Sequence, residues 1–186
     1  TTQNATVAEY TTKYTEDKSI VLYAVWTANT YTVKYNGNGA TSGSTASSTH
    51  TYDKAQNLTA NGYERKYTVT YNHNYTGSED VKVTTSYTFN GWAETAEGAK
   101  KYSDKQSVTN LSSTANGTVN LYANWTPVAI SGGLRTPTRT GYTFGGWYKE
   151  TGCTTKVGEA GAAYTPTADI TLFAKWTANT YTVKYN

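Results

Sequence analysis

The chain of 186 residues contains one cysteine, no methionine and only three prolines. A single thiol, Cys153, excludes an internal disulfide and a zinc site built from thiolates. Charged residues make up only 16% of the chain, and the formal net charge of +3 forms no basic stripe, so nucleic-acid binding is not expected. No apolar run approaches the roughly 18 residues of a membrane-spanning helix.

Residues that commonly serve as metal ligands or catalytic groups are also few. The two histidines, His50 and His73, have no acidic or cysteine partner at ligand spacing and are expected in surface loops. The acidic residues nowhere form the pattern of an EF-hand calcium loop. No acid, base and nucleophile converge on one motif, so the sequence predicts no enzyme, no cofactor and no bound metal.

The sequence is instead rich in aromatic residues, with 18 Tyr, five Trp and three Phe. Thr, Tyr and Val suit the pleated surface of a sheet, so the composition favours strands over helices. Each aromatic side chain buries a large area, so a few of them can hold a small core together. The composition therefore predicts a mainly β fold.

One decapeptide, TANTYTVKYN, occurs twice, at residues 27–36 and again at residues 177–186. The residues before each copy also match in pattern, with IVLYAVW at 20–26 and ITLFAKW at 170–176. An identical match of this length predicts a repetitive architecture rather than a self-contained enzyme. The chain then holds about one period of a longer array.

Three shorter signatures recur within this period. The first, Tyr-Thr-Val-x-Tyr-Asn, lies at residues 31–36, 67–72 and 181–186. The second, Tyr-Thr-Phe-x-Gly-Trp, lies at 87–92 and 142–147, and the third, Leu-aromatic-Ala-x-Trp, at 22–26, 121–125 and 172–176. Each has the period of two that is typical of a strand.

The signatures also predict which side chains form the core. In the second signature, strict alternation places Phe89 and Trp92 on opposite faces, and Gly91 (or Gly146 in the other copy) permits a bulge or close backbone approach that turns both rings inward. The expected structural core is Leu22, Trp26, Phe89, Trp92, Leu121, Trp125, Phe144, Trp147, Leu172 and Trp176.

One segment suggests a helix. Residues 51–58 offer Asp53 as an N-cap and Gln56 at the capping-box position, and Gly62 would end the helix after one or two turns.

Two divisions of the chain into units are open. In the linear division, a long unit covers residues 30–126 and carries an extra hairpin near 66–86, while a short unit at 127–177 lacks its first strand. In the nested division, which gives both units a complete set of strands, a compact unit at 67–126 lies inside a unit made of 28–66 plus 127–177.

The ends of the chain are interpreted in the same way under both divisions. Residues 1–27 are expected to be the C-terminal tail of a preceding unit, and residues 178–186 the first strand of a following one. Unpaired strand edges recruit partners, so we expect the two ends to pair between molecules and form head-to-tail chains.

The run PTRTGYTFGGWY at 137–148, followed by ITLFAKW at 170–176, resembles the Listeria–Bacteroides repeat, the B-repeat family of internalin-type surface proteins. With the internal copies the resemblance covers nearly the whole chain, although Ser86 replaces the glycine that should precede Tyr87. The resemblance implies tandem, small β-grasp-like (SUMO-like) units with short helical segments. It also implies an extracellular location at the bacterial cell surface or cell wall, and no catalytic residues.

The sequence thus predicts a structural spacer, in which neighbouring units of a stalk stabilise one another. The alternative is an adhesion module that binds a host protein or glycan through exposed tyrosine and threonine faces. The side chains of Tyr23, Tyr122 and Phe173, on the strand face opposite the Leu-Ala-Trp row, are the candidate ligand contacts.

Overall fold

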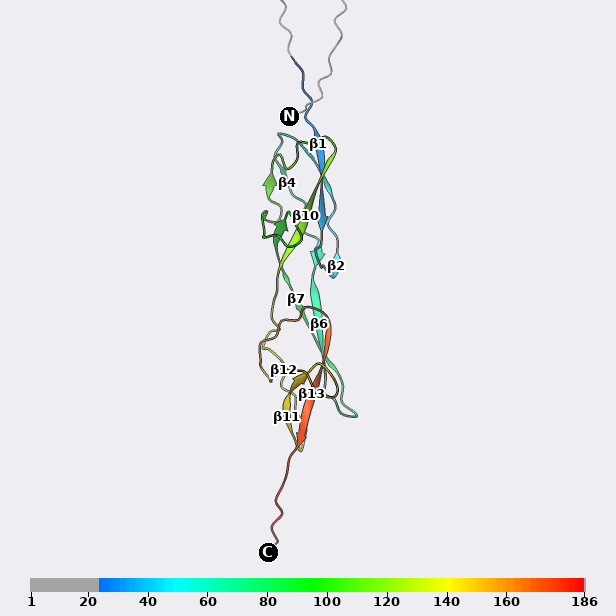
Figure 1. Cartoon of the computed structure of the whole chain (residues 1–186), viewed down its shortest axis with the longest axis vertical. Coiled ribbons are helices and arrows are strands. Elements are labelled where there is room, and N and C mark those ends of the chain that lie inside the picture. The colour runs from blue at the N-terminus through cyan, green and yellow to red at the C-terminus, as the bar shows by residue number, and fades with distance from the viewer. Residues whose placement is uncertain (1–23, 186) are drawn as a thin grey trace, which may run out of the picture. The chain divides into compact units, whose positions relative to one another are not determined.

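The computed structural model describes residues 24–185 (Figure 1). These residues form a mainly β structure without a helix. The strands are β1 (Thr30–Asn36), β2 (Ser42–Gly43), β3 (Ser48–Thr51), β4 (Gln56–Asn57), β5 (Tyr63–Glu64), β6 (Lys66–Asn72), β7 (Val81–Ser86), β8 (Thr88–Ala93), β9 (Ser107–Val108), β10 (Gly117–Thr126), β11 (Tyr142–Tyr148), β12 (Lys156–Gly158) and β13 (Ile170–Ala178). The mainly β expectation is confirmed.

The chain forms two compact units whose segments alternate along the sequence. Among the described residues, unit 1 comprises 24–38, Ser44–Gly62 and Gly91–Asn124. Unit 2 comprises Gly39–Gly43, Tyr63–Asn90 and residues 125–185. Neither unit is built from one continuous stretch of sequence.

Unit 1 is organised around a sheet with the strand order β3-β1-β10-β8. The strand β1 pairs in parallel with β10 and antiparallel with β3. Alternation along β1 turns Tyr31, Val33 and Tyr35 into the core, where they are almost completely buried. The ring of Tyr35 lies 4.7 Å from that of Trp92, between ring centroids.

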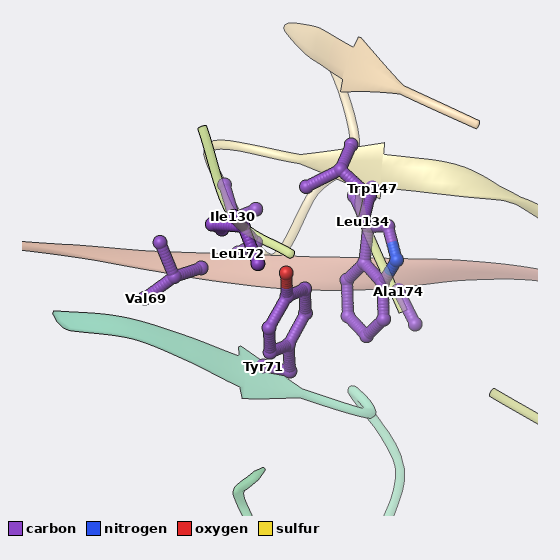
Figure 2. Packing of buried hydrophobic residues seen from close by; sticks show 7 residues of the cluster. All are labelled: Val69, Tyr71, Ile130, Leu134, Trp147, Leu172 and Ala174. Carbon is purple, nitrogen blue, oxygen red and sulfur yellow. The ribbon is translucent and has the colours of Figure 1, made fainter. Parts of the chain in front are cut away.

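Unit 2 repeats this arrangement in a sheet with the order β12-β11-β13-β6-β7. The strand β6 pairs in parallel with β13 and antiparallel with β7. Figure 2 shows the side chains of Tyr71, Trp147 and Leu172 converging from β6, β11 and β13. The ring centroids of Tyr71 and Trp147 are 4.7 Å apart, the same distance as in the equivalent pair of unit 1.

The two parallel pairs also share one register. Tyr35 lies opposite Leu121 in unit 1, and Tyr71 lies opposite Leu172 in unit 2. In both cases the second tyrosine of the first signature meets the leucine of the third. The three signatures therefore assemble in the same way twice.

The hairpin expected near residues 66–86 is present as β6 and β7. It contributes to unit 2 the first strand that the segment 127–177 does not contain. This grouping differs from the nested division, in which strand 67–72 and the third signature at 121–125 share one compact unit. In the structure, β10 carries that third signature and pairs with β1 instead.

The bulge expected at the glycine of the second signature is confirmed in β11. The register of β11 against β13 shifts between Phe144 and Trp147, and Gly146 has a positive φ of 110°. The shift brings the rings of Phe144 and Trp147 to 5.4 Å of each other on one side of the strand. Only glycine enters this backbone region without strain, which gives the residue its mechanical role.

The helix expected at residues 51–58 is wrong. Asp53 lies in the turn after β3 with φ of 60°, whereas an N-cap needs an extended backbone, and residues 56–57 form β4. The polar groups of Asp53 that would cap a helix bond instead to Asn110, which lies far away in the sequence. Asn110 accepts a hydrogen bond from the Asp53 amide N–H at 2.6 Å and donates to its carboxylate at 2.8 Å. The helical segment of a β-grasp unit is thus not found in the described residues.

The strand pairing predicts how fragments of this chain behave. We expect residues 63–126 alone, and residues 127–178 alone, to remain unfolded, because β6 is then separated from β13 and β10 from β1. Each separation exposes residues such as Tyr71 or Leu121 that are fully buried in the whole chain. Circular dichroism and amide hydrogen exchange on both fragments and the intact chain measure this. Cooperative folding of residues 63–126 alone would support the nested division instead.

Candidate functional site

The parallel pairing of the first and last strand is the feature that both units share and that bears most directly on a mechanical role. In unit 1, β1 and β10 align over six residue pairs, from Tyr31 with Gly117 to Asn36 with Tyr122. In unit 2, β6 and β13 align from Val69 with Ile170 to Asn72 with Phe173. We call these two pairs the parallel seams. In a parallel pair the N-terminal ends of both strands lie at the same end of the pair. A pull on the N-terminal end of one strand and the C-terminal end of the other therefore slides the strands past each other.

An asparagine closes each seam. The side-chain amide of Asn38 donates hydrogen bonds to the carbonyls of Ala123, on the last strand, and of Ala96, in the loop after β8, at 2.9 and 2.8 Å. Asn74 repeats these contacts in unit 2, with donations to Ala174 at 3.2 Å and Thr151 at 3.0 Å. One side chain thus ties the end of the first strand to the last strand and to a loop.

The backbone of both asparagines suits this task. Asn38 and Asn74 have positive φ values of 46° and 59°, a region that asparagine tolerates better than most residues. Their amide N–H groups donate to the side chains of Asn36 and Asn72 at 2.8 and 2.7 Å, which forms an Asx turn. Sequence reasoning did not identify Asn38 or Asn74, which we call the asparagine clamps, as functional residues. The signal that could have found them is the Asn-x-Asn that begins at the last residue of the first signature.

Most of the expected core residues lie in the two cores. Trp92, Trp147, Leu121 and Leu172 are fully buried. Four further residues expected in the core are half-buried and form two pairs, Phe89 with Trp125 at 5.6 Å and Phe144 with Trp176 at 5.5 Å between centroids.

The first copy of the third signature differs from the other two. Trp26, also expected in a core, is 56% exposed, and Leu22 lies outside the described residues.

The expected ligand face is only partly open. Tyr122 and Phe173 are half-buried, and Tyr23 lies outside the described residues. Tyr122 is aligned with Asn36 across the seam of unit 1, and Phe173 with Asn72 across that of unit 2. A ligand contact at these residues stays a prediction.

The histidines differ from one another. The expectation of a surface loop is wrong for His50, which lies in β3 with no exposed surface, stacked on Tyr31 at 5.5 Å between centroids. The Nε2 atom of its ring is 2.9 Å from the Ser48 hydroxyl oxygen. Burial lowers the pKa of His50, because a charged imidazole loses its hydration there. His73 follows β6 in a loop and is half-buried.

The carboxylates and Cys153 are the remaining candidates for metal binding. Residues 24–185 contain no group of three or more His, Cys, Asp or Glu placed to hold a metal. Within the same range, no helix has the length and apolarity to cross a membrane. Cys153 lies in a turn, and its thiol is 3.6 Å from the carbonyl oxygen of Thr151.

The ionised side chains form exposed pairs. Lys66 contacts Glu64 at 2.6 Å, Lys101 contacts Glu94 at 2.6 Å, and Lys156 contacts Glu159. The hydrogen bond from Lys101, followed by that from Tyr102, lowers the pKa of Glu94. Exposed ion pairs of this kind add little to the free energy of unfolding, so they are not the main source of the stability of either unit.

Substitution of the clamp tests its contribution. Asn74→Ala removes the hydrogen bonds of the side-chain amide and places alanine at a positive φ, so we expect the free energy of unfolding to fall by about 1–3 kcal/mol. Asn74→Gly is the matched control, because it loses the same hydrogen bonds but adopts the backbone freely, and it should cost about 0.5–1 kcal/mol less. Urea denaturation measures both. An alanine variant as stable as the wild type would contradict the clamp.

The buried histidine predicts acid sensitivity. Because the pKa of His50 is lower in the folded than in the unfolded chain, the unfolded chain binds more protons between the two values. Stability is therefore fully present above about pH 6.5, the ordinary imidazole value, and falls as the pH drops below it. In urea titrations at pH 7.5 and 5.0, His50→Phe should lose less stability on acidification than the wild type. His73→Gln is the control and should behave as the wild type does; an unchanged response of His50→Phe would refute the assignment.

Comparison with known proteins agrees with these repeated signatures. No curated protein and no solved structure matches the chain. A family model, the Listeria-Bacteroides repeat domain, matches residues 64–124 and 128–175. Together the matches cover more than half of the chain, and each contains one Tyr-Thr-Phe-x-Gly-Trp signature. The chain belongs to the Listeria-Bacteroides repeat family.

Proposed function

We propose that this chain is a non-catalytic spacer in the stalk of an extracellular bacterial surface protein. The family supports a repeat module of surface proteins. The observation that carries the mechanical role is the parallel seam in each unit. A stalk has to keep its length under tension, and this strand geometry resists extension.

The physical argument rests on how force reaches the hydrogen bonds. When the two strands of a seam are pulled at opposite ends, all the hydrogen bonds between them are loaded together and must break together. When the strands are pulled at the same end, the bonds break one after another, each at a low force. Forced unfolding is governed by the height of this unfolding barrier.

The alternation of segments strengthens the same role. Each seam joins two strands that lie far apart in the sequence, so the chain between them stays closed off from extension until the seam breaks. Units of this size bury a small share of their surface and gain stability from neighbours. A spacer that is stabilised in this way needs neither a ligand nor a reactive group.

Single-molecule pulling on unit 1 tests the proposal. In a Cys153→Ser background, handles at Thr30→Cys and Thr126→Cys load the β1–β10 seam from opposite ends. Handles at Thr30→Cys and Thr118→Cys load it from one end, because Tyr31 is aligned with Gly117. We expect a severalfold higher rupture force in the first geometry. Equal forces would remove the mechanical basis of the spacer.

We further propose that the partners of this chain are neighbouring units that pair with its second decapeptide. In the first copy, Tyr31 and Val33 are buried in β1, which pairs with β10 and β3, whereas the equivalent Tyr181 and Val183 are 77% and 69% exposed. Identical sequence supports the same partner, a strand with the Leu-aromatic-Ala-x-Trp signature, in a neighbouring unit or molecule.

Sedimentation velocity over a range of concentrations measures this pairing. The wild-type chain should associate as concentration rises, because its second decapeptide is open. Val183→Lys should be monomeric, since a lysine replaces the side chain that faces the partner core. Lys184→Glu, which changes the opposite face of the same segment, is the control. A wild-type chain that stays monomeric at millimolar concentration would contradict the proposal for separate molecules.

A further inference from the structure

Unit 2 contains an open groove of about 660 Å³ that takes no part in the seam. Its aromatic walls come from three elements: Trp176 on β13, Tyr142 and Phe144 on β11, and Tyr75 in the loop after β6. The loop before β11 completes it with Arg139 and the hydroxyl-bearing Thr138 and Thr140. Its volume falls in the range that holds small-molecule ligands.

The aromatic rings of the groove are held in place. The indole N–H of Trp176 donates to the His73 carbonyl at 2.7 Å. Phe144 contacts one side of this indole, and Tyr75 approaches it edge-on at 6.3 Å between centroids. A ligand therefore meets a preformed surface, which lowers the entropy cost of binding.

Arg139 is the only charged residue that lines the groove. Its guanidinium carbon lies 3.6 Å from the ring centroid of Tyr142 and 4.6 Å from that of Tyr75. Among residues 24–185, no acidic side chain forms an ion pair with it. Stacking uses the faces of the guanidinium and leaves the N–H groups at its edges available for a planar anion.

The other copies of the signatures form their sheet pairs without the residues of this groove. Alignment of the first signature places Gly39 at the position of Tyr75, counted from the tyrosines at 31 and 67. Alignment of the second places Thr84 at the position of Arg139. The signatures assemble in the same register without either side chain. Tyr75 and Arg139 are therefore additions to a fold that forms without them.

We propose that this groove binds an acidic saccharide, a sugar that carries a carboxylate. The carboxylate accepts a bidentate pair of hydrogen bonds from Arg139, and the apolar face of the sugar ring packs on the aromatic wall. Thr138 and Thr140 supply hydroxyl partners for the sugar hydroxyls. The groove contains no carboxylate that would repel such a ligand. This binding role goes beyond the mechanical function proposed above and does not depend on it.

An acidic sugar, a neutral sugar and inorganic phosphate differ in which parts of the groove they contact. A neutral sugar uses the aromatic wall but leaves the arginine without an anion. Inorganic phosphate pairs with the arginine but makes no use of the wall. An acidic sugar uses both, so it should bind more tightly than either.

Titration of the intact chain with D-glucuronate, D-glucose and inorganic phosphate, followed by ¹H–¹⁵N NMR, tests this proposal. The indole N–H resonance of Trp176 reports on the groove, because its hydrogen bond fixes the ring there. We expect glucuronate to shift this resonance with a dissociation constant at least tenfold lower than those of glucose and phosphate, since charge-assisted hydrogen bonds are the strong ones.

Two variants identify the binding group. Arg139→Gln should weaken glucuronate binding about tenfold while the backbone spectrum stays that of the folded chain. Lys82→Gln removes the same charge from a separate hollow, beside Asp169, and should bind as the wild type does. No shift with glucuronate at tens of millimolar would overturn the proposal. Equal binding by Arg139→Gln, or equal affinity for glucose or phosphate, would overturn it as well.

Discussion

Both units depend on a contact between one tyrosine and one tryptophan. Tyr35 meets Trp92, and Tyr71 meets Trp147, each at 4.7 Å between ring centroids. Aromatic pairs at this distance bury much area and add a specific attraction. The contact joins the first signature to the second, and the leucine of the third lies opposite the same tyrosine. The two tryptophans are also the largest side chains that are fully buried in the described residues.

The parallel seam lies beside that contact. The tyrosine of the first strand is aligned with the leucine of the last in a parallel pair, and a parallel pair requires the chain between its strands to cross over. In unit 1 that crossover includes the β6–β7 hairpin, which supplies the first strand of unit 2. One length of chain thus serves as a connection for one unit and as a core strand for the other. The asparagine clamps then fix the end of each seam.

Much of the local structure was predictable from the sequence. The period of two identified the strands of the three signatures, and Gly146 marked the bulge that turns Phe144 and Trp147 to one side. Two predictions failed where a residue depends on distant partners. Asp53 lies in a turn because Asn110 bonds it, and His50 is buried because β3 joins the sheet beside β1. Asn110 and the strand β1 lie far from these residues in sequence, so a local pattern could not include them.

The two copies of the decapeptide separate what the sequence determined from what the tertiary structure decided. Alternation determines that the tyrosines and valine share one face wherever the decapeptide forms a strand, as it does in β1, because this depends only on the geometry of a strand. Whether that face is buried was decided by the partners. Tyr31 is 1% exposed between β3 and β10, whereas Tyr181, in an identical sequence, is 77% exposed. The sequence of a first strand likewise does not select its partner, because β1 and β6 are nearly identical. The structure pairs β1 with β10 and β6 with β13. Burial and pairing depend on which strands the rest of the chain brings alongside, and a repeated sequence cannot specify that by itself.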